Sequence, residues 1–353
     1  MKKSCKYCLN DYTVKKIKID ENGKCNFCNT YDEYYEKLHD YDFLEKLFLE
    51  KIKNTEGYDY DVALGFSGGK DSAYVLYKLV KDYKLRVYAY TLDNGFLSDE
   101  AKKRIDDIVK ELQVDHEYVE CDTTLLKKVY KQITTKYLSP CIACSFLGYA
   151  VMINEASKVN AKVGIHGRST YQMFRNFSKD VDDVFKPFIL TGLEKEVNLN
   201  ELYQNILNKI ELLVDKKLKK EIEDKLLNDA FTKGFREFIA YFLYHPYHKE
   251  EVVDFLKTNT IWNFNTEAEH FDCKIHYGAW YLKSLAARRD HLLPEYSVMI
   301  REQHLSKEEA KQLMNQKIDI NRAKKELKLF CRYSKVNYHK LMLKAKVYSK
   351  RWW

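Results

Sequence analysis

Asp-Val-Ala-Leu-Gly-Phe-Ser-Gly-Gly-Lys-Asp-Ser, residues 61–72, is the stretch that decides the fold of this chain. It begins with an apolar, strand-like run and is followed by residues 73–80, whose pattern is helical. The turn between them supplies two glycines, two hydroxyls and a lysine: Ser67, Gly68, Gly69, Lys70 and Ser72. Glycines let backbone N–H groups converge, and a helix N-terminus adds its positive dipole end. We therefore predict a loop that binds a polyphosphate.

The spacing within this loop separates two kinds of phosphate-binding loop. The common NTPase loop has four residues between its glycines and a hydroxyl residue after its lysine. Here Gly65 and Gly69 enclose three residues, and Asp71 follows Lys70. The sequence instead resembles the PP-loop of ATP pyrophosphatases, which adenylate a substrate oxygen and release pyrophosphate. This resemblance implies that Phe66 to Ser72 bind ATP, that Lys70 and Asp71 are catalytic, and that Asp71 contacts Mg²⁺. The alternative is a surface turn that caps a helix.

The composition is that of a soluble, globular protein. The chain has 353 residues, of which 45% are hydrophobic and 32% charged, which is enough for two domains. No apolar run reaches the roughly 20 residues that a membrane span requires, and no signal peptide is recognisable at the N-terminus. We expect a cytoplasmic protein, because cysteines in CxxC pairs fit metal binding in a reducing compartment better than disulfides.

Residues 1–30 contain two CxxC pairs, formed by Cys5, Cys8, Cys25 and Cys28. Two short loops that each present two thiolates can close a tetrahedral site around one ion, which lets a segment too small for a core fold. We predict a structural zinc ribbon, with a redox or iron site as the less favoured alternative. Residues 31–54 are then expected to form a charged amphipathic helix within a linker over 31–57.

Residues 58–176 alternate strand and helix patterns, and we assign them to the ATP-binding domain. The expected strands are Val62 to Phe66, Arg86 to Leu92, His116 to Glu120 and Lys162 to His166. Such βα units predict an α/β fold with a doubly wound parallel sheet, of the adenine nucleotide alpha hydrolase-like kind, and a ligand at the carboxyl ends of the strands. Asp93 follows one strand, where it either contacts adenosine or forms a turn. Gly167 and Arg168 follow another and are further candidates for nucleotide binding.

Residues 177–353 are rich in helical patterns, so we predict a helical C-terminal domain that contacts substrate or partners. The segment from Arg322 to Trp353 carries eleven Lys or Arg against one Glu. Interleaved with aromatic residues such as Tyr348, Trp352 and Trp353, it fits a nucleic-acid contact. We favour the alternative that it packs on its own protein, because it has apolar residues to bury: Leu327, Leu329, Phe330, Leu341, Leu343 and Val347.

A third CxxC pair, Cys141 and Cys144, lies at a predicted helix start, where the dipole is expected to lower thiol pKa values. We consider both catalytic candidates. Two thiolates do not complete a metal site, so a third ligand is needed, and Cys273 or His276 can supply it. Three cysteines fit a [4Fe-4S] cluster with one open iron that carries sulfide for transfer. The alternative is that these cysteines are packing residues, as we expect of Cys121 and Cys331.

Over its whole length the chain resembles the N-acetyl sugar amidotransferases of surface-polysaccharide (LPS/O-antigen) biosynthesis. The resemblance lies in the paired CxxC motifs, the SGGKDS loop, the later CxxC and the stretch from Phe271 to Tyr277. It implies ATP-dependent conversion of the acetamido group of a nucleotide sugar into an acetamidine, with ammonia from glutaminase and channel partners. One departure is the run Gly167 to Gln172, where the family has Gly-Glu followed by Glu-Tyr.

A second hypothesis is a PP-loop sulfur transferase, similar to the enzymes that thiolate tRNA or small molecules with a three-cysteine cluster. Both reactions begin by adenylating an oxygen and differ in the nucleophile, ammonia or sulfide. Cys273 and the basic C-terminus favour sulfur transfer and a nucleic-acid partner, whereas the full-length resemblance favours the amidotransferase. A non-catalytic nucleotide-binding scaffold is the least favoured hypothesis.

Overall fold

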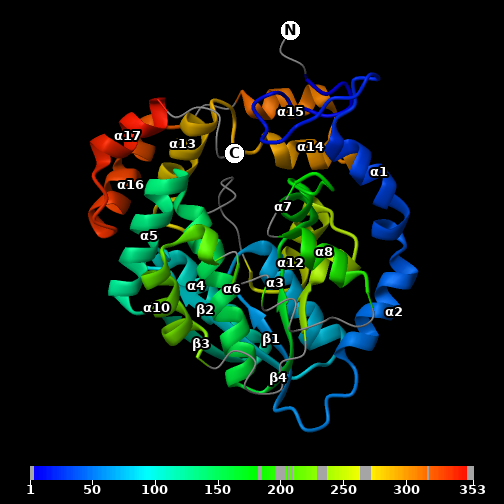
Figure 1. The fold of residues 1–353 in the computed structure, drawn as a ribbon. Coiled ribbons are helices and arrows are strands. Elements are labelled where there is room, and N and C mark those ends of the chain that lie inside the picture. The colour runs from blue at the N-terminus through cyan, green and yellow to red at the C-terminus, as the bar shows by residue number, and fades with distance from the viewer. Residues whose placement is uncertain are drawn as a thin grey trace.

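The computed structural model describes residues 4–181, 185–194, 204, 207–208, 210–228, 237–262, 272–315 and 318–347. A parallel sheet lies at its centre (Figure 1), with strands in the order β3-β2-β1-β4-β5. The strands are β1 Tyr60–Gly65, β2 Val87–Asp93, β3 Asp115–Glu120, β4 Ala161–His166 and β5 Glu237–Ala240. Every neighbouring pair is parallel. This confirms the predicted α/β class.

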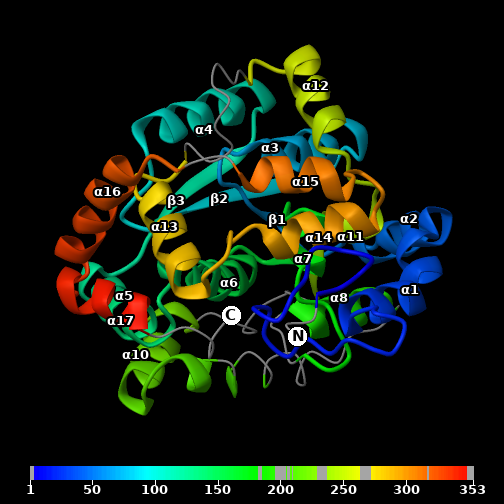
Figure 2. The same cartoon turned by 90° about the horizontal axis from the view of Figure 1, so that it is seen from above.

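Helices cover both faces of the sheet, as Figure 2 shows, with α3 and α4 on one side and α5 and α6 on the other. Their bounds are α3 Lys70–Tyr77, which continues as a π turn over Lys78–Asp82, α4 Asp99–Leu112, α5 Thr123–Tyr137 and α6 Pro140–Lys158. Local capping explains two of the starts. Ser98 accepts a hydrogen bond from the Ala101 N–H at 3.0 Å, and Asp122 accepts one from the Leu125 N–H at 2.7 Å. The alternation along the chain is therefore a doubly wound βα arrangement.

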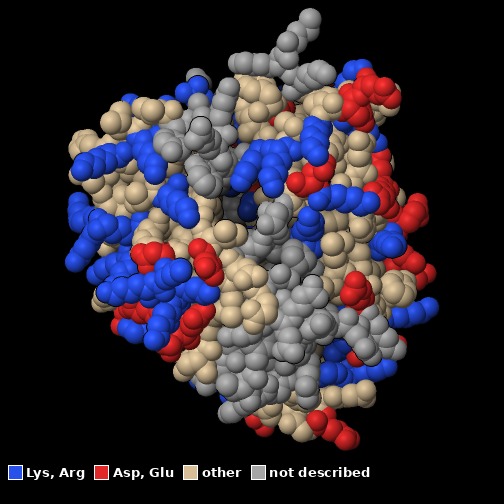
Figure 3. All heavy atoms as spheres, viewed as in Figure 1, with Lys and Arg blue, Asp and Glu red and all other residues tan. Residues whose placement is uncertain are grey.

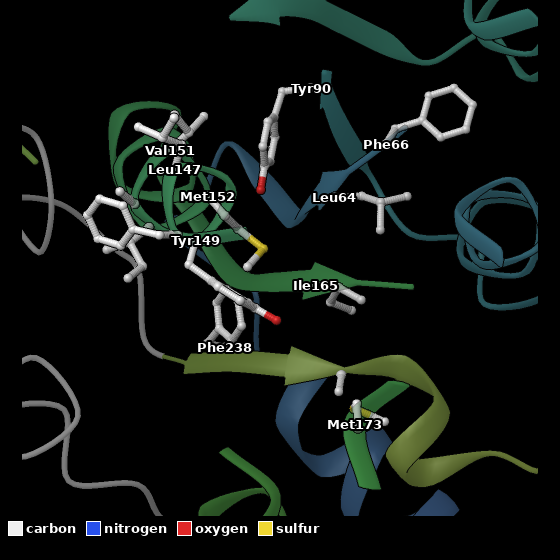
Figure 4. Close-up of a cluster of buried hydrophobic side chains, with 14 of the residues drawn as sticks. Leu64, Phe66, Tyr90, Leu147, Tyr149, Val151, Met152, Ile165, Met173 and Phe238 are labelled. Carbon is white, nitrogen blue, oxygen red and sulfur yellow. The ribbon is translucent and has the colours of Figure 1, made fainter. Parts of the chain in front are cut away.

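The core lies on both faces of the central strands, and α6 covers one of these faces. Val62, Ala63 and Leu64 of β1 are each 0% exposed, as expected for a strand covered on both faces. Figure 4 shows side chains of β1, β2, β4, β5 and α6 in one apolar cluster. This packing fixes β1, and with it the start of the glycine-rich loop.

The fifth strand was not predicted. Glu237–Ala240 pairs in parallel with β4, although the sequence after residue 176 indicated helices. A four-residue strand is too short to show an alternating pattern, and all four of its residues are buried. Around it lie α7 Thr170–Phe174, α8 Phe185–Gly192, α10 Lys216–Leu226, α11 Tyr241–Tyr244 and α12 Lys249–Asn259.

The helices that follow lie over the end of the sheet where the strands finish, together with the N-terminal segment (Figures 1 and 2). They are α13 His276–Ala287, α14 Leu293–Arg301, α15 Lys307–Met314, α16 Ile320–Tyr333 and α17 Tyr338–Val347. α13 and α16 pack backbone to backbone, since a Cβ on Gly278 would lie 2.6 Å from the Leu327 nitrogen. The helical C-terminal region is confirmed. The domain boundary at 176/177 stays a prediction.

The described part of the basic C-terminal segment, residues 322–347, packs on its own protein, as we favoured. Leu327, Phe330 and Leu341 are buried, whereas Leu329, Leu343 and Val347 are 42%, 64% and 69% exposed. Tyr348, Trp352 and Trp353 lie outside the described residues. Within the described residues, no helix combines the length and apolar character that crossing a bilayer requires.

The linker contains two helices where one was predicted. α1 spans Asn26–His39 and α2 spans Tyr41–Ile52. Asp40 separates them, and its side chain accepts a hydrogen bond from the Phe43 N–H at 3.1 Å. An N-cap residue has non-helical dihedral angles, so capping α2 ends the continuous helix that the amphipathic pattern suggested.

Candidate active site

The glycine-rich loop lies at the centre of the sheet's carboxyl edge. β1 has β2 on one side and β4 on the other. The strand order reverses here, and open α/β sheets bind ligands in the crevice at such a point. The structure thus confirms the strand, glycine-rich turn and helix predicted for residues 61–80.

Hydroxyl groups hold the loop in its shape. The Ser67 and Ser72 Oγ atoms are 3.1 Å apart, and the Ser72 hydroxyl donates to the Gly69 carbonyl at 3.1 Å. The Gly69 N–H in turn donates to Ser67 Oγ at 3.3 Å. Gly69 is the N-cap residue of α3, so the first-turn N–H groups of the helix begin in the loop. The arrangement is preorganised for an anion.

Gly68 meets two conditions that only glycine satisfies easily. Its φ angle is +74°, and a Cβ there would lie 2.7 Å from Cγ1 of Ile105 on α4. Its carbonyl accepts a hydrogen bond from the indole N–H of the buried Trp262 at 3.4 Å. The loop is therefore held from α4 and from the segment after α12, and the second of these contacts was not predicted from the sequence.

Lys70 and Asp71 are both half-buried and contact one another. Lys70 Nζ lies 3.1 Å from Asp71 Oδ2, and the Tyr247 hydroxyl donates to Asp71 Oδ1 at 2.9 Å. Tyr247 comes from the turn before α12, far along the chain, and sequence analysis missed it because an isolated tyrosine has no pattern. Asp71 is thus oriented from both sides.

The turn after β4 approaches the loop closely. A Cβ on Gly167 would lie 3.0 Å from the Asp71 carbonyl oxygen and 3.0 Å from Ser72 Cα, so a larger residue would displace the start of α3. The Arg168 N–H donates to His166 Nδ1 at 3.2 Å, and the Arg168 guanidinium lies 5.7 Å from the centre of the Tyr149 ring. Gly167 and Arg168 therefore lie at the same edge as the loop.

Asp93 forms the turn that was one of its two predicted roles. It ends β2, accepts a hydrogen bond from the Gly95 N–H at 2.9 Å and pairs with Lys102 at 3.2 Å. This is an Asx-type turn. Its role as an adenosine contact stays a prediction.

The fold brings together Cys141, Cys144 and Cys273, which we call the inner cysteines. Asn94, just after β2, donates from Nδ2 to Cys144 Sγ at 3.8 Å, and Cys273 forms a β-bridge with Leu97. Each inner cysteine is within electrostatic range of the other two. In the described part of the chain their sulfur atoms do not form a group within 4.8 Å of one another. The three sulfur atoms are therefore not grouped closely enough in this structure to bind one zinc ion together.

The predicted lowering of the thiol pKa values at this helix start was wrong. Cys141 follows Pro140, the first residue of α6, yet desolvation by the surrounding protein raises the pKa of its thiol even though the side chain is exposed. Burial raises the pKa of Cys144 to about 12 and also raises that of Cys273. At the half-buried Cys144, desolvation outweighs the helix dipole, because much of the water that would stabilise its thiolate is removed.

Cys5, Cys8, Cys25 and Cys28 form the N-terminal cysteine cluster. All four side chains are buried, and their sulfur atoms lie within 4.8 Å of one another. Two of the separations are 3.9 Å, for Cys5 and Cys28, and 3.7 Å, for Cys8 and Cys25. A tetrahedron with metal–sulfur bonds of about 2.3 Å has edges of about 3.8 Å. The cluster therefore has the dimensions of a site for one tetrahedral ion.

This cluster is docked on the C-terminal helices. An Arg301 guanidinium N–H donates to Cys28 Sγ at 3.9 Å, and the Leu9 N–H donates to Ser297 Oγ at 3.2 Å. Both partners lie on α14. Lys307, at the start of α15, donates to the Lys6 carbonyl at 2.8 Å. The N-terminal segment therefore packs against the C-terminal helices over the carboxyl edge of the sheet.

Comparison with known proteins gives distant similarities. No family model matches the chain. An uncharacterized protein of Methanocaldococcus jannaschii is 28% identical over 235 residues, which are 64% of this chain and 72% of that protein.

Among the solved structures that are similar to this chain, three have TM-scores below 0.5. An NH₃-dependent NAD synthetase from Campylobacter jejuni has a TM-score of 0.32 and 15% identity, over 54% of this chain and 94% of that one. A U34-tRNA thiolase from Methanococcus maripaludis, solved with its [4Fe-4S] cluster, has a TM-score of 0.38 and 15% identity, over 90% and 91%. An NMN synthetase from Francisella tularensis has a TM-score of 0.26 and 13% identity, over 55% and 92%. Similarities this low carry no functional conclusion, so the proposals below depend on the geometry of this chain.

Proposed function

We propose that this chain is an AMP-forming enzyme that binds ATP at the glycine-rich loop and adenylates an oxygen atom of its substrate. The observation that carries the proposal is the loop itself: Gly68 in the left-handed region at the start of α3, beside the close turn at Gly167. The backbone N–H groups of the loop and the Lys70 side chain are suited to hold the pyrophosphate that leaves when the substrate oxygen attacks the α-phosphorus of ATP. A Mg²⁺ ion would further neutralise the phosphates, with Asp71 as the candidate ligand.

The second step replaces the adenylated oxygen with a nucleophile. We propose that the substrate is an N-acetyl nucleotide sugar and that the nucleophile is ammonia. The acetamido oxygen would take the AMP group, ammonia would add to the amide carbon, and AMP would leave with that oxygen to give an acetamidine. Adenylation is needed because an amide oxygen is a poor leaving group. Support comes from the full-length sequence resemblance, which also implies glutaminase and channel subunits as the ammonia source.

One observation favours a second candidate, sulfur transfer. Cys144 lies beside Asn94, just after β2, and Cys273 is bridged to Leu97 farther along the same segment, at the edge of the sheet where an adenylated substrate would lie. A [4Fe-4S] cluster held by the three of them would supply an iron with an open position for sulfide. The displaced group would again be AMP, and the acceptor would be a tRNA or a small molecule. Cys141, Cys144 and Cys273 would then be ligands, with no need for lowered thiol pKa values.

For the N-terminal cysteine cluster we propose a structural zinc ion. Its four buried thiolates complete the coordination and leave no open position for chemistry. We further propose that the protein works in the cytoplasm, where thiols stay reduced, since all nine cysteines are free in the structure.

The experiment that tests the proposal measures AMP and pyrophosphate release with a panel of N-acetylated UDP-sugars and ammonium chloride. We expect Lys70→Ala to lower the rate by a factor of about 100 or more, because the variant loses the cation that would stabilise the negative charge on the leaving pyrophosphate. Lys103→Ala is the matched control, since Lys103 is 77% exposed on α4 and pairs only with Asp107 in the described contacts. Equal rates in the two variants would refute the role of the loop.

The metal and acid-labile sulfide content of anaerobically purified protein distinguishes ammonia transfer from sulfur transfer. About one zinc and no iron supports ammonia transfer, whereas about one zinc with three or four irons and sulfide supports sulfur transfer. Cys144→Ser, beside the Asn94 side chain, sharpens the result. Full product formation by this variant would exclude a cluster-based reaction.

A further inference from the structure

The Tyr247 side chain reaches the glycine-rich loop from a distant part of the chain. It lies in the turn between α11 and α12, is 4% exposed, and donates a hydrogen bond from its hydroxyl to Asp71 Oδ1 at 2.9 Å. The other carboxylate oxygen, Asp71 Oδ2, lies 3.1 Å from Lys70 Nζ. Each oxygen of this carboxylate therefore has its own partner, a neutral donor for Oδ1 and a cation for Oδ2.

Aromatic packing fixes the turn that carries Tyr247. The Tyr247 ring lies edge-on to the rings of Phe242 on α11 and Tyr171 on α7, with ring centres 4.7 Å and 5.0 Å away. The helix that follows the turn, α12, packs on α3 through aromatic side chains. Asp71 is on α3, so both partners of the hydrogen bond belong to elements that pack against each other. A side chain that is held by packing can hold a functional group in one orientation.

The position of Asp71 calls for a cation. Asp71 is the second residue of α3, so its carboxylate lies at the helix N-terminus that we propose binds phosphate. Figure 3 shows a hollow in this face of the molecule with Lys or Arg atoms at its base, in the region where α7, α13 and α14 meet in Figure 1. A carboxylate repels nearby phosphate groups unless a cation lies between them. Mg²⁺ takes oxygen ligands and binds in nucleotide sites through one or two carboxylates together with phosphates, so Asp71 fits this ion.

We propose that Tyr247 is a positioning residue for Asp71 in the ATP site. Its hydroxyl holds Oδ1, which leaves Oδ2 as the oxygen available to a Mg²⁺ ion that binds with ATP. The last torsion of an Asp side chain has broad minima, so a carboxylate without this hydrogen bond turns easily. Holding it beforehand reduces the conformational freedom that is lost on binding. Since Tyr247 acts on Oδ1, the carboxylate keeps this contact when Lys70 turns to phosphate. The inference rests on the proposed function.

The test is calorimetric titration of the full chain with a non-hydrolysable ATP analogue at a series of Mg²⁺ concentrations. Tyr247→Phe keeps the ring and loses the hydroxyl. We expect it to raise the Mg²⁺ concentration that gives half of the maximal affinity by about tenfold, because a hydrogen bond to a charged group is lost. At saturating Mg²⁺ the affinity should stay within about twofold of that of the unaltered chain, since mass action restores the metal-bound form. A variant that only distorted the loop would bind the analogue more weakly at every Mg²⁺ concentration.

Tyr171→Phe is the matched control. It removes one hydroxyl from the same aromatic cluster, but the hydrogen-bond partner of that hydroxyl is His304 Nδ1, at 2.7 Å. Its Mg²⁺ dependence should match that of the unaltered chain. In an Asp71→Asn background, Tyr247→Phe should cause no further change in Mg²⁺ dependence, because the hydroxyl acts through that carboxylate.

An unchanged Mg²⁺ dependence in Tyr247→Phe, or an equal shift in Tyr171→Phe, would overturn the proposal. So would an Asp71→Asn variant whose Mg²⁺ dependence matches that of the unaltered chain, and this measurement decides the matter even where Tyr247→Phe does not fold. If the unaltered chain bound no analogue at any Mg²⁺ concentration, the proposed function would fail and this inference with it. Analogue binding that Tyr247→Phe leaves unchanged would overturn the inference alone.

Discussion

Replacing Gly68 with alanine measures how much of the loop's shape depends on a missing side chain. Two penalties follow from the structure. At φ +74° an L-residue is in the left-handed region, which costs about 1–2 kcal/mol. The new Cβ would also lie 2.7 Å from Ile105 Cγ1, and relieving such overpacking costs about 1–3 kcal/mol. We expect Gly68→Ala to lower the free energy of unfolding by about 2–5 kcal/mol.

Gly57→Ala separates these two penalties. Gly57 has a φ of +82°, but nothing lies within 4 Å of the position its Cβ would take. It should therefore show only the backbone penalty, about 1–2 kcal/mol. Equilibrium unfolding in urea gives both free-energy changes, provided that the unfolding free energy depends on urea concentration with the same slope in both variants and in the unaltered chain. The difference between the variants is the contribution of the contact with Ile105.

A double-mutant cycle with Ile105→Ala checks the assignment to that contact. In the Ile105→Ala background the alanine at position 68 has room, so its cost should fall to that of Gly57→Ala. A Gly68→Ala variant no less stable than Gly57→Ala, or one whose cost is unaffected by Ile105→Ala, would refute the steric reasoning. Affinity for a non-hydrolysable ATP analogue should fall in Gly68→Ala and stay unchanged in Gly57→Ala, since only the first alters the glycine-rich loop that we propose binds phosphate.

Two further predictions concern the metal site and the response to acid. Cys25→Ser should remove the zinc ion that we propose for the N-terminal cysteine cluster and lower thermal stability, because the cluster then lacks one of its four ligands. Zinc analysis and a melting curve measure this, and a zinc-loaded, fully stable variant would contradict it. Burial lowers the pKa of His166 to about 3, so below about pH 6.5 the unfolded chain binds a proton that the folded chain does not, and stability is lost as the pH falls toward 3. His166→Gln should flatten this loss in urea titrations between pH 6.5 and 4, and an equally steep loss in the variant would show that other groups cause it.

The sequence determined the features that depend on local pattern. Apolar strands separated by amphipathic helices predicted the parallel sheet, and the glycines after β1 predicted the shape of the turn that follows it, because glycine alone adopts that turn easily. Phosphate binding by this loop stays a prediction. The spacing of Cys5, Cys8, Cys25 and Cys28 was enough to predict a closed four-thiolate site, since short loops hold each pair together.

Only the tertiary structure decided what lies around the loop. Tyr247 on Asp71, Trp262 on Gly68 and the short strand β5 come from segments far along the chain, and their sequences have no pattern that indicates these contacts. The thiol pKa of Cys144 was predicted in the wrong direction, because a helix start is visible in sequence whereas desolvation depends on everything packed around it. Local spacing fixes backbone shape, but the charge and solvation of a site are sums over neighbours that only the fold brings together.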